Sequence, residues 1–299
     1  MAADLASPAM NLVQVAILAL VQALTEFLPI SSSAHLVLVR WLLDWEDPGL
    51  FFDVALHFGT LLALTAYFAG AWVRILGSAV GLRMRQPTPN HPDRDLDGNP
   101  RLLWFLAAAT VPAACAGMAF QDTIEAHLRS PAVIATMLIG VGCVIWWADR
   151  NARQDKGVGD LSLGSCLLIG CAQALALVPG TSRAGATIAV ALLLGLERQA
   201  AARFSFLLAM PIVAGAALKT GLDTLGGASG QAVEYLPLGL GVLVSAVAGY
   251  GVITLFLRYL QHATMAPFVY YRWAFGILVL LLAGTDGELA LLAEFIQGE

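Results

Sequence analysis

The sequence predicts an all-α polytopic membrane protein with six transmembrane helices and two re-entrant helical hairpins, arranged as an inverted-topology repeat. The composition supports a membrane protein, because 59% of the 299 residues are hydrophobic and only 12% are charged, against roughly one quarter charged in soluble chains. Six long apolar runs and two interrupted apolar regions supply the elements. We expect one integral membrane domain over residues 1–299, with repeat halves of about 1–148 and 149–299.

Composition and charge exclude several other classes of protein. The high hydrophobic content argues against a disordered chain, and the net charge of −5 provides no basic stripe for nucleic acid. The first ten residues contain no Lys or Arg, which does not match the start of a cleaved signal peptide. The cysteines are predicted to be small buried hydrophobic residues without a disulfide or zinc role; they are Cys115, Cys143, Cys166 and Cys171.

The six predicted spans are runs of about 20 apolar residues, the length needed to cross about 30 Å of hydrocarbon. They cover about 53–72, 102–120, 132–148, 204–222, 235–257 and 266–284. The two further regions, 12–43 and 161–196, are each interrupted by a proline and a hydroxyl-rich segment. Their second arms would rise only about 15–20 Å as helices, too short to cross untilted. Each region is therefore predicted to be a re-entrant hairpin.

The distribution of Lys and Arg predicts the topology. Segment 73–101 carries five of them, 149–160 carries three, and 197–203 and 258–272 carry two each, whereas 121–131 and 223–234 carry one and none. Cytoplasmic loops are the ones enriched in Lys and Arg. With that assignment the six spans alternate only when each hairpin returns to its side of entry. Both termini then lie outside, and the hairpins enter from opposite sides.

A weak internal repeat agrees with this topology. Gln22-Ala23-Leu24 precedes Pro29, and Gln173-Ala174-Leu175 precedes Pro179. In inverted repeats, binding sites form where the interrupted helices meet. Outside the apolar segments, residues 83–101 carry four prolines among charged residues, which predicts a polar surface connector and no separate soluble domain.

Ionisable side chains within the apolar regions gather at the two breaks. An ionisable group at bilayer depth costs about 2.5–3.5 kcal/mol, so it usually faces a polar cavity or a partner. Glu26 and His35 flank the first break, and Arg183 follows the second. Gln22 lies four residues before Glu26, and Thr187 lies four after Arg183. Each pair therefore shares one helix face.

Each break also begins a helix with hydroxyl side chains: Ser31, Ser32 and Ser33 in the first, Thr181 and Ser182 in the second. Helix N-termini suit anions, the Arg183 guanidinium matches phosphate geometry, and Gly180 allows close backbone approach. Opposite them, Glu26 can hold a divalent cation with Gln22 as a neutral ligand, and His35 titrates near neutrality. The set predicts a phosphate or diphosphate site with a metal, an acid or base, and hydroxyl nucleophiles.

Structural roles are the alternative interpretation. The serines can be helix N-caps, Glu26 and Arg183 can form a structural ion pair, His35 can be a hydrogen-bonded interior histidine, and Gln22 can bridge helices. The functional interpretation is favoured because these residue types occur together at two breaks that the topology brings into contact.

A second group of polar residues near the outer end of a span is interpreted as interfacial. Asp53 and His57 lie four apart and are expected to form an interfacial pair, not a ligand set. Arg40, Trp41 and Trp45 have the composition of an interface belt.

Two sequence motifs span the two breaks. The first runs from Gln22 to His35 and contains Glu26, Pro29 and the serine run. The second is Pro179-Gly180-Thr181-Ser182-Arg183-Ala184-Gly185-Ala186-Thr187. Both motifs resemble those of the bacterial undecaprenyl-diphosphate phosphatases, also called bacitracin-resistance proteins, and the likeness continues through residues 204–211 over nearly the whole chain. Gln22 stands where many members have Glu, and Ala184 replaces the usual second serine of the second motif.

The resemblance implies hydrolysis of undecaprenyl diphosphate to undecaprenyl phosphate and inorganic phosphate, which recycles the carrier lipid for peptidoglycan synthesis. It also implies a divalent cation, Mg²⁺ or Ca²⁺, and an active site on the outer, periplasmic face of the bacterial inner membrane. The expected partners are the polyprenyl diphosphate lipid and the bilayer, with no nucleic acid; a homodimer is left open.

The expected roles of the residues follow from this implied reaction. Arg183, Ser182 and the helix N-terminal amides would bind the terminal phosphate, supported by Thr187. Glu26, assisted by Gln22, would hold the metal. His35 would act as base or acid beside Ser32, and attack by Ser32 is favoured over attack by His35 or a metal-bound water. The rival function is a secondary transporter or lipid flippase with the same architecture; an ion channel fits less well, because no ring of like charges lines the site.

Overall fold

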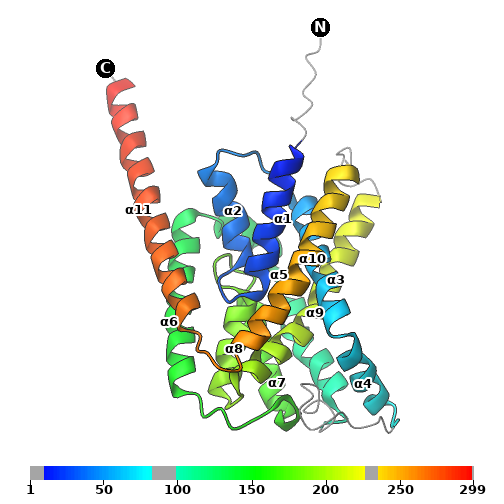
Figure 1. Cartoon of the computed structure of the whole chain (residues 1–299). Coiled ribbons are helices and arrows are strands. Elements are labelled where there is room, and N and C mark those ends of the chain that lie inside the picture. Colours follow the sequence, from blue (N-terminus) through cyan, green and yellow to red (C-terminus); the bar gives the residue numbers. More distant parts are fainter. Residues whose placement is uncertain (1–9, 83–98, 226–234, 298–299) are drawn as a thin grey trace.

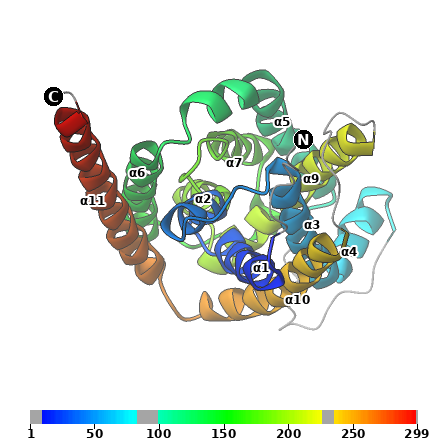
Figure 2. The same ribbon diagram turned by 90° about the horizontal axis from the view of Figure 1, so that it is seen from above.

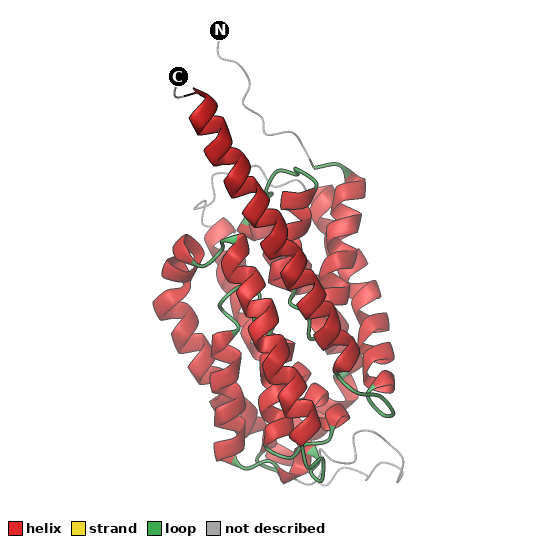
Figure 3. Ribbon diagram, turned by 90° about the vertical axis from the view of Figure 1, so that its left-hand side faces the viewer, coloured by secondary structure: helices red, strands yellow, loops and turns green. Residues whose placement is uncertain are grey.

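The computed structural model describes residues 10–82, 99–225 and 235–297, and this part of the chain is helical throughout apart from turns and one isolated bridge (Figure 3). Residues 83–98 of the predicted connector and residues 226–234 lie outside the described part. The α-helices are α1 Leu12–Phe27, α2 Ser32–Leu42, α3 Leu50–Tyr67, α4 Ala69–Ala79, α5 Leu102–His127, α6 Pro131–Asn151, α7 Leu163–Leu175, α8 Arg183–Leu193, α9 Arg198–Leu225, α10 Tyr235–Tyr259 and α11 Ala266–Gln297, with a short 3₁₀ helix, η2, at Val158–Asp160.

Six of the described helices are long and apolar enough to cross a bilayer, as the sequence predicts. The apolar segments are Leu50–Tyr67, Leu102–Phe120, Pro131–Asn151, Arg198–Asp223, Tyr235–Tyr259 and Ala266–Gly284. The first differs from the predicted 53–72, because α3 ends at Tyr67 and a separate helix, α4, begins at Ala69. We therefore treat the chain as a multi-pass membrane protein.

The two interrupted regions fold as pairs of short helices that pack against each other, α1 with α2 and α7 with α8. Asn11 accepts the Val13 amide at the start of α1, and Ser162 accepts the Ser165 amide at the start of α7, so side chains cap both first arms. At the start of each second arm, Ser31 and Ser182 adopt positive φ angles of 79° and 69°. Such angles are uncommon outside glycine and cluster at functional sites.

The short helices lie inside the bundle. In Figure 1, α1 and α2 occupy the upper half and α7 and α8 the lower half, so that the turns face the middle of the molecule. Viewed from above, α2 and α7 lie within the arc of α5 and α6, and α11 stands at the periphery (Figure 2). Helix α10 packs on α1 and α3, α7 on α5, α8 on α6 and α9, and α11 on α6.

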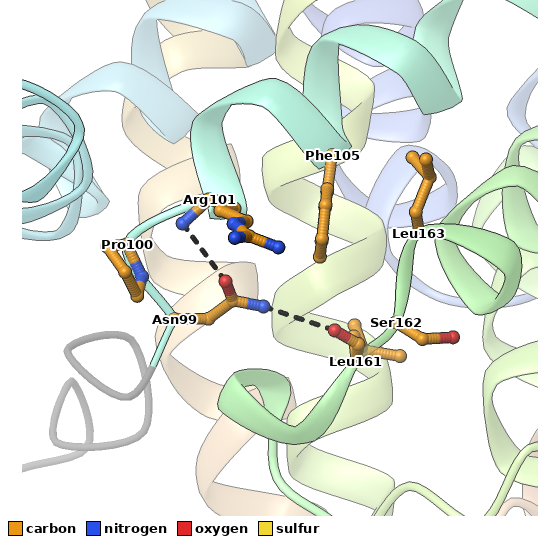
Figure 4. A pocket seen from close by; sticks show the side chains of 7 residues that line it. All are labelled: Asn99, Pro100, Arg101, Phe105, Leu161, Ser162 and Leu163. Atoms are coloured by element: carbon orange, nitrogen blue, oxygen red, sulfur yellow. Dashed lines mark hydrogen bonds between the residues drawn. The ribbon is translucent and has the colours of Figure 1, made fainter.

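Polar contacts tie the connections together at the lower end of Figure 1. Asp149 accepts from Arg198 Nε at 2.5 Å and from the Met265 amide at 3.1 Å. This carboxylate therefore joins the ends of α6, α9 and α11. Beside a shallow pocket at the same end, the Asn99 side-chain amide donates to the Leu161 carbonyl at 3.1 Å (Figure 4). The starts of α5 and α7 are thereby linked.

The prediction that all four cysteines are buried is wrong for three of them. All four thiols are free, but only Cys166 is buried, whereas Cys115, Cys143 and Cys171 are exposed. The expected burial of these three is wrong because an apolar residue of a spanning helix can face outward as easily as inward.

Glycine allows α7 to approach α5 closely. A Cβ built on Gly170 would lie 2.1 Å from the Ala109 carbonyl oxygen of α5, whereas a Cβ on Gly140 of α6 would meet nothing within 4 Å. We predict that Gly170→Ala lowers the free energy of unfolding by about 1–3 kcal/mol, because the helices must separate. Thermal unfolding in detergent measures the change. Gly140→Ala is the control and should be neutral or slightly stabilising; equal effects of the two variants would contradict the packing argument.

Candidate active site

The two turns meet through an ion pair. Glu26 is near the end of α1 and Arg183 is the first residue of α8, and Arg183 Nη2 donates to Glu26 Oε1. Only 4% of the Glu26 side chain and 19% of the Arg183 side chain are exposed. The carboxylate and guanidinium predicted at separate breaks are therefore direct neighbours. Arg183 also approaches the Ala209 carbonyl of α9, at 3.5 Å.

Glu26 collects further polar groups on its second oxygen. Oε2 accepts from Ser32 Oγ at 2.6 Å and from Gln22 Nε2 at 3.1 Å, and His57 Nε2 of α3 lies 3.4 Å away. The Gln22 hydrogen bond follows from the predicted four-residue spacing on one helix face. The Gln22 amide oxygen is buried and has no hydrogen-bond partner among the residues that the structure describes.

A cavity of about 550 Å³ opens beside this ion pair. Its walls are mostly apolar and come from α3, α5, α7 and α9, with a polar floor at the two turns. The predicted site residues that line it are Glu26, Ser31, Ser32, Ser33, Ser182 and Arg183. Pockets that are largely apolar with a few convergent polar groups are typical of small-molecule sites.

His35 is placed differently from Ser32. Its Nδ1 donates to the Ser31 carbonyl at 2.7 Å, and its Nε2 lies 2.7 Å from the Tyr271 hydroxyl. The ring also stacks on Tyr271 and Phe275 of α11. Both ring nitrogens are thus engaged, and the Ser32 hydroxyl bonds to Glu26 instead.

The remaining predicted residues also lie away from the cavity lining. Thr187 is fully buried and bonds to the Arg183 carbonyl at 2.7 Å and to Ser205 Oγ of α9 at 2.6 Å. Gly180 has a φ of 91°, and a Cβ there would lie 2.4 Å from the Ile134 carbonyl. Within the described ranges, the buried Thr181 hydroxyl has no hydrogen-bond partner. The Thr187 hydrogen bond connects α8 to α9, and the absence of a side chain at Gly180 lets the second turn lie against α6.

Arg272 does not lie in a loop, although the distribution of Lys and Arg places it in the positive segment 258–272. It lies within α11 and is 0% exposed. Its guanidinium donates to five carbonyls, those of Pro29, Gly180, Thr181, Leu138 and Met137. Three of these belong to the two turns, so one side chain joins both. Its position six residues inside the predicted span 266–284 was the available signal.

His57 is a second residue that was missed. Its Nδ1 donates to the Asp53 backbone carbonyl at 2.7 Å, and the ring lines the cavity. The Asp53 carboxylate instead takes both Arg40 nitrogens, at 2.8 and 3.0 Å. The expected interfacial pairing of the Asp53 and His57 side chains is therefore wrong. The assignment of Arg40 to an interface belt is also wrong, because Arg40 is buried.

Fold and site together define a polytopic helical membrane protein with a polar site enclosed between two broken helices. A family model for the bacitracin resistance protein BacA matches residues 15–278. The chain belongs to this family.

Curated relatives agree over nearly their full length. The chain is 47% identical over 277 residues to undecaprenyl-diphosphatase 2 of Stutzerimonas stutzeri (strain A1501), covering 91% of this chain and 98% of that protein. It is 46% identical over 276 residues to undecaprenyl-diphosphatase of Teredinibacter turnerae (strain ATCC 39867 / T7901), covering 91% and 99%.

The Arg272 contacts predict a large effect of substitution on stability. Arg272→Gln removes the charge and most of the donors, which leaves buried turn carbonyls without partners at about 1–3 kcal/mol each. We expect the melting temperature in detergent to fall by at least several degrees. The control is Arg258→Gln at the exposed end of α10, which should change it little. A melting temperature for Arg272→Gln equal to that of the control would show that the turns do not depend on this side chain.

Proposed function

We propose that this protein hydrolyses undecaprenyl diphosphate to undecaprenyl phosphate and inorganic phosphate, which returns the carrier lipid to peptidoglycan synthesis. The observation that carries the proposal is the Glu26–Arg183 pair beside the cavity. A guanidinium fork suits a phosphate group, a carboxylate suits a proton or a cation, and the apolar walls suit a lipid tail. Both relatives carry the name undecaprenyl-diphosphatase, which agrees with this reaction.

The terminal phosphate would bind to Arg183, Ser182 and the N-terminal amides of α2 and α8. Unpaired amides at helix N-termini favour anions, and donors aimed at developing negative charge contribute strongly to phosphoryl transfer. Once phosphate occupies the Arg183 fork, the Glu26 carboxylate is released from the guanidinium. Gly180 and Thr187 would act indirectly, through the position of the second turn.

The nucleophile in this proposal is Ser32, with Glu26 as its base. The 2.6 Å hydrogen bond from Ser32 Oγ to Glu26 Oε2 supports this pairing over the expected pairing with His35. Attack by Oγ on the terminal phosphorus breaks the bond to the bridging oxygen, and undecaprenyl phosphate leaves. Water then hydrolyses the phosphoserine, which restores the hydroxyl and releases inorganic phosphate. His35 would orient the first turn through its bond to the Ser31 carbonyl.

A divalent cation, Mg²⁺ or Ca²⁺, is part of the proposal. Glu26 and the unpartnered Gln22 oxygen are the oxygen ligands available to hold it. Among the described residues no three His, Cys, Asp or Glu side chains cluster as a metal site, which fits Mg²⁺ because that ion commonly binds through one or two carboxylates, water and substrate phosphates. When bound, the cation would neutralise phosphate charge.

We also propose the orientation in the membrane. The pairs α1–α2 and α7–α8 are taken as re-entrant hairpins of an inverted repeat, supported by their short lengths and by the matching positive φ at Ser31 and Ser182. Lys219 at the cavity lies ten residues beyond Ala209 on α9, about 15 Å along the helix. That end of α9 lies with the start of α1 (Figure 1), so the cavity would open to the periplasm from the bacterial inner membrane. Homodimer formation stays open in this proposal.

The direct test of this function is phosphate release from undecaprenyl diphosphate by the purified protein in detergent. With no sealed compartment, release can come only from hydrolysis. If the protein instead moves the lipid across the liposome membrane and liberates no phosphate, it is a transporter or flippase and not a phosphatase.

Variants of the ion pair separate catalysis from structure. Glu26→Gln and Arg183→Gln should each lower kcat/KM by at least about 100-fold, and each leaves one buried charge uncompensated. The double variant removes both charges, so its melting temperature should recover toward the wild-type value while its activity stays low. Recovery of activity in the double variant would mean that the pair serves only the fold.

Substitution of Ser32 tests the nucleophile. Ser32→Ala should abolish turnover to near background, whereas His35→Gln should leave measurable activity because an amide can still donate to the Ser31 carbonyl. Quenched reactions of the wild type should also contain protein-bound phosphate on Ser32, detectable by mass spectrometry. Substantial turnover by Ser32→Ala would instead assign the attack to water.

A further inference from the structure

Gln173 is a buried polar side chain that has no part in the reaction proposed above. It is 3% exposed, and neither its amide oxygen nor its amide nitrogen has a hydrogen-bond partner in the described part of the chain. Leaving buried polar atoms unpaired is costly, and such groups are rare in folded proteins. An unpaired amide of this kind is therefore a candidate for hydrogen bonding to a ligand that enters the cavity.

The first half of the chain provides a comparison. Gln22 occupies the equivalent position in the repeated Gln-Ala-Leu sequence, and its amide nitrogen donates to Glu26 four residues further on. Four residues after Gln173 the chain has Leu177. The second half thus keeps the amide but lacks the carboxylate that would satisfy it.

The position of Gln173 on the cavity wall limits what it can bind. It lines the same cavity as Arg183, on the same stretch of wall as Ala176 and Leu177. Leu177 in turn lies against α5, where its Cδ2 is 3.9 Å from a Cβ built on Gly117. Gln173 therefore supplies a polar group on the apolar wall of a cavity whose floor is charged.

We propose that the Gln173 amide nitrogen binds the phosphate that stays on the lipid. This inference rests on the proposed function. In this proposal Arg183 and Ser182 hold the terminal phosphate. The phosphate bonded to the lipid is then one bridging oxygen away, toward the apolar cavity wall beside which the lipid tail lies. An amide N–H is a suitable neutral donor for it. Gln173 is then a binding residue for the lipid phosphate, distinct from the groups that contact the phosphate to be removed.

The two products of the reaction allow a selective test, since each carries one of the two phosphates. Gln173→Met keeps the size of the side chain and removes the amide. We expect the KM for undecaprenyl diphosphate and the inhibition constant of undecaprenyl phosphate each to rise about tenfold, as for loss of one hydrogen bond to a charged group. The inhibition constant of inorganic phosphate should not change. Gln173→Glu, which places a carboxylate at the same site, should raise the first two constants further.

The controls separate this inference from stability and from the proposed function. Because the amide has no partner, Gln173→Met should melt at or above the wild-type temperature; a clear fall would overturn the assignment. Gln261→Met, at an exposed position after α10, should leave every constant unchanged. Unchanged constants in both Gln173 variants, or weaker inhibition by inorganic phosphate, would also overturn it. If the wild type releases no phosphate, the proposed function is wrong. Direct binding of undecaprenyl phosphate to the wild type and to Gln173→Met then still tests the role of Gln173.

Discussion

The buried contact between Glu26 and Arg183 is the constraint on which the rest of the site depends. Two charges taken out of water are costly unless each keeps a close partner and further hydrogen bonds. Here Ser32 and Gln22 supply those bonds to the carboxylate, and the residues that carry the pair lie 157 positions apart in the sequence. The pair therefore forms only when both broken helices are correctly placed.

That placement is maintained by groups outside the cavity. Arg272 satisfies carbonyls from both turns, His35 holds the Ser31 carbonyl, and Thr187 fixes the start of α8 to Ser205 of α9. The positive φ angles of Ser31 and Ser182 cost about 1–3 kcal/mol each. Such conformations persist because the surrounding contacts hold the backbone dihedral angles of both residues in place.

Much of this arrangement is readable from the sequence, and the failures have physical causes. The spans follow from run length, and the contact between Glu26 and Arg183 agrees with the prediction that the two interrupted regions meet. The partner of Ser32 could not be predicted, because Glu26 and His35 are both close in sequence and only the turn geometry selects between them. His57 was missed since its nearness to Glu26 depends on how α3 packs beside α1. Arg272 was misassigned because a residue near a predicted helix end was grouped with the adjacent loop.

The location of Arg272 has a consequence for biosynthesis. The motif residues come before α11 in the chain, whereas the side chain that holds both turns, Arg272, belongs to α11. A chain that has not yet reached α11 would lack the Arg272 hydrogen bonds to the carbonyls of its two turns. In this arrangement the two turns gain these hydrogen bonds only once α11 has been made and has packed on α6.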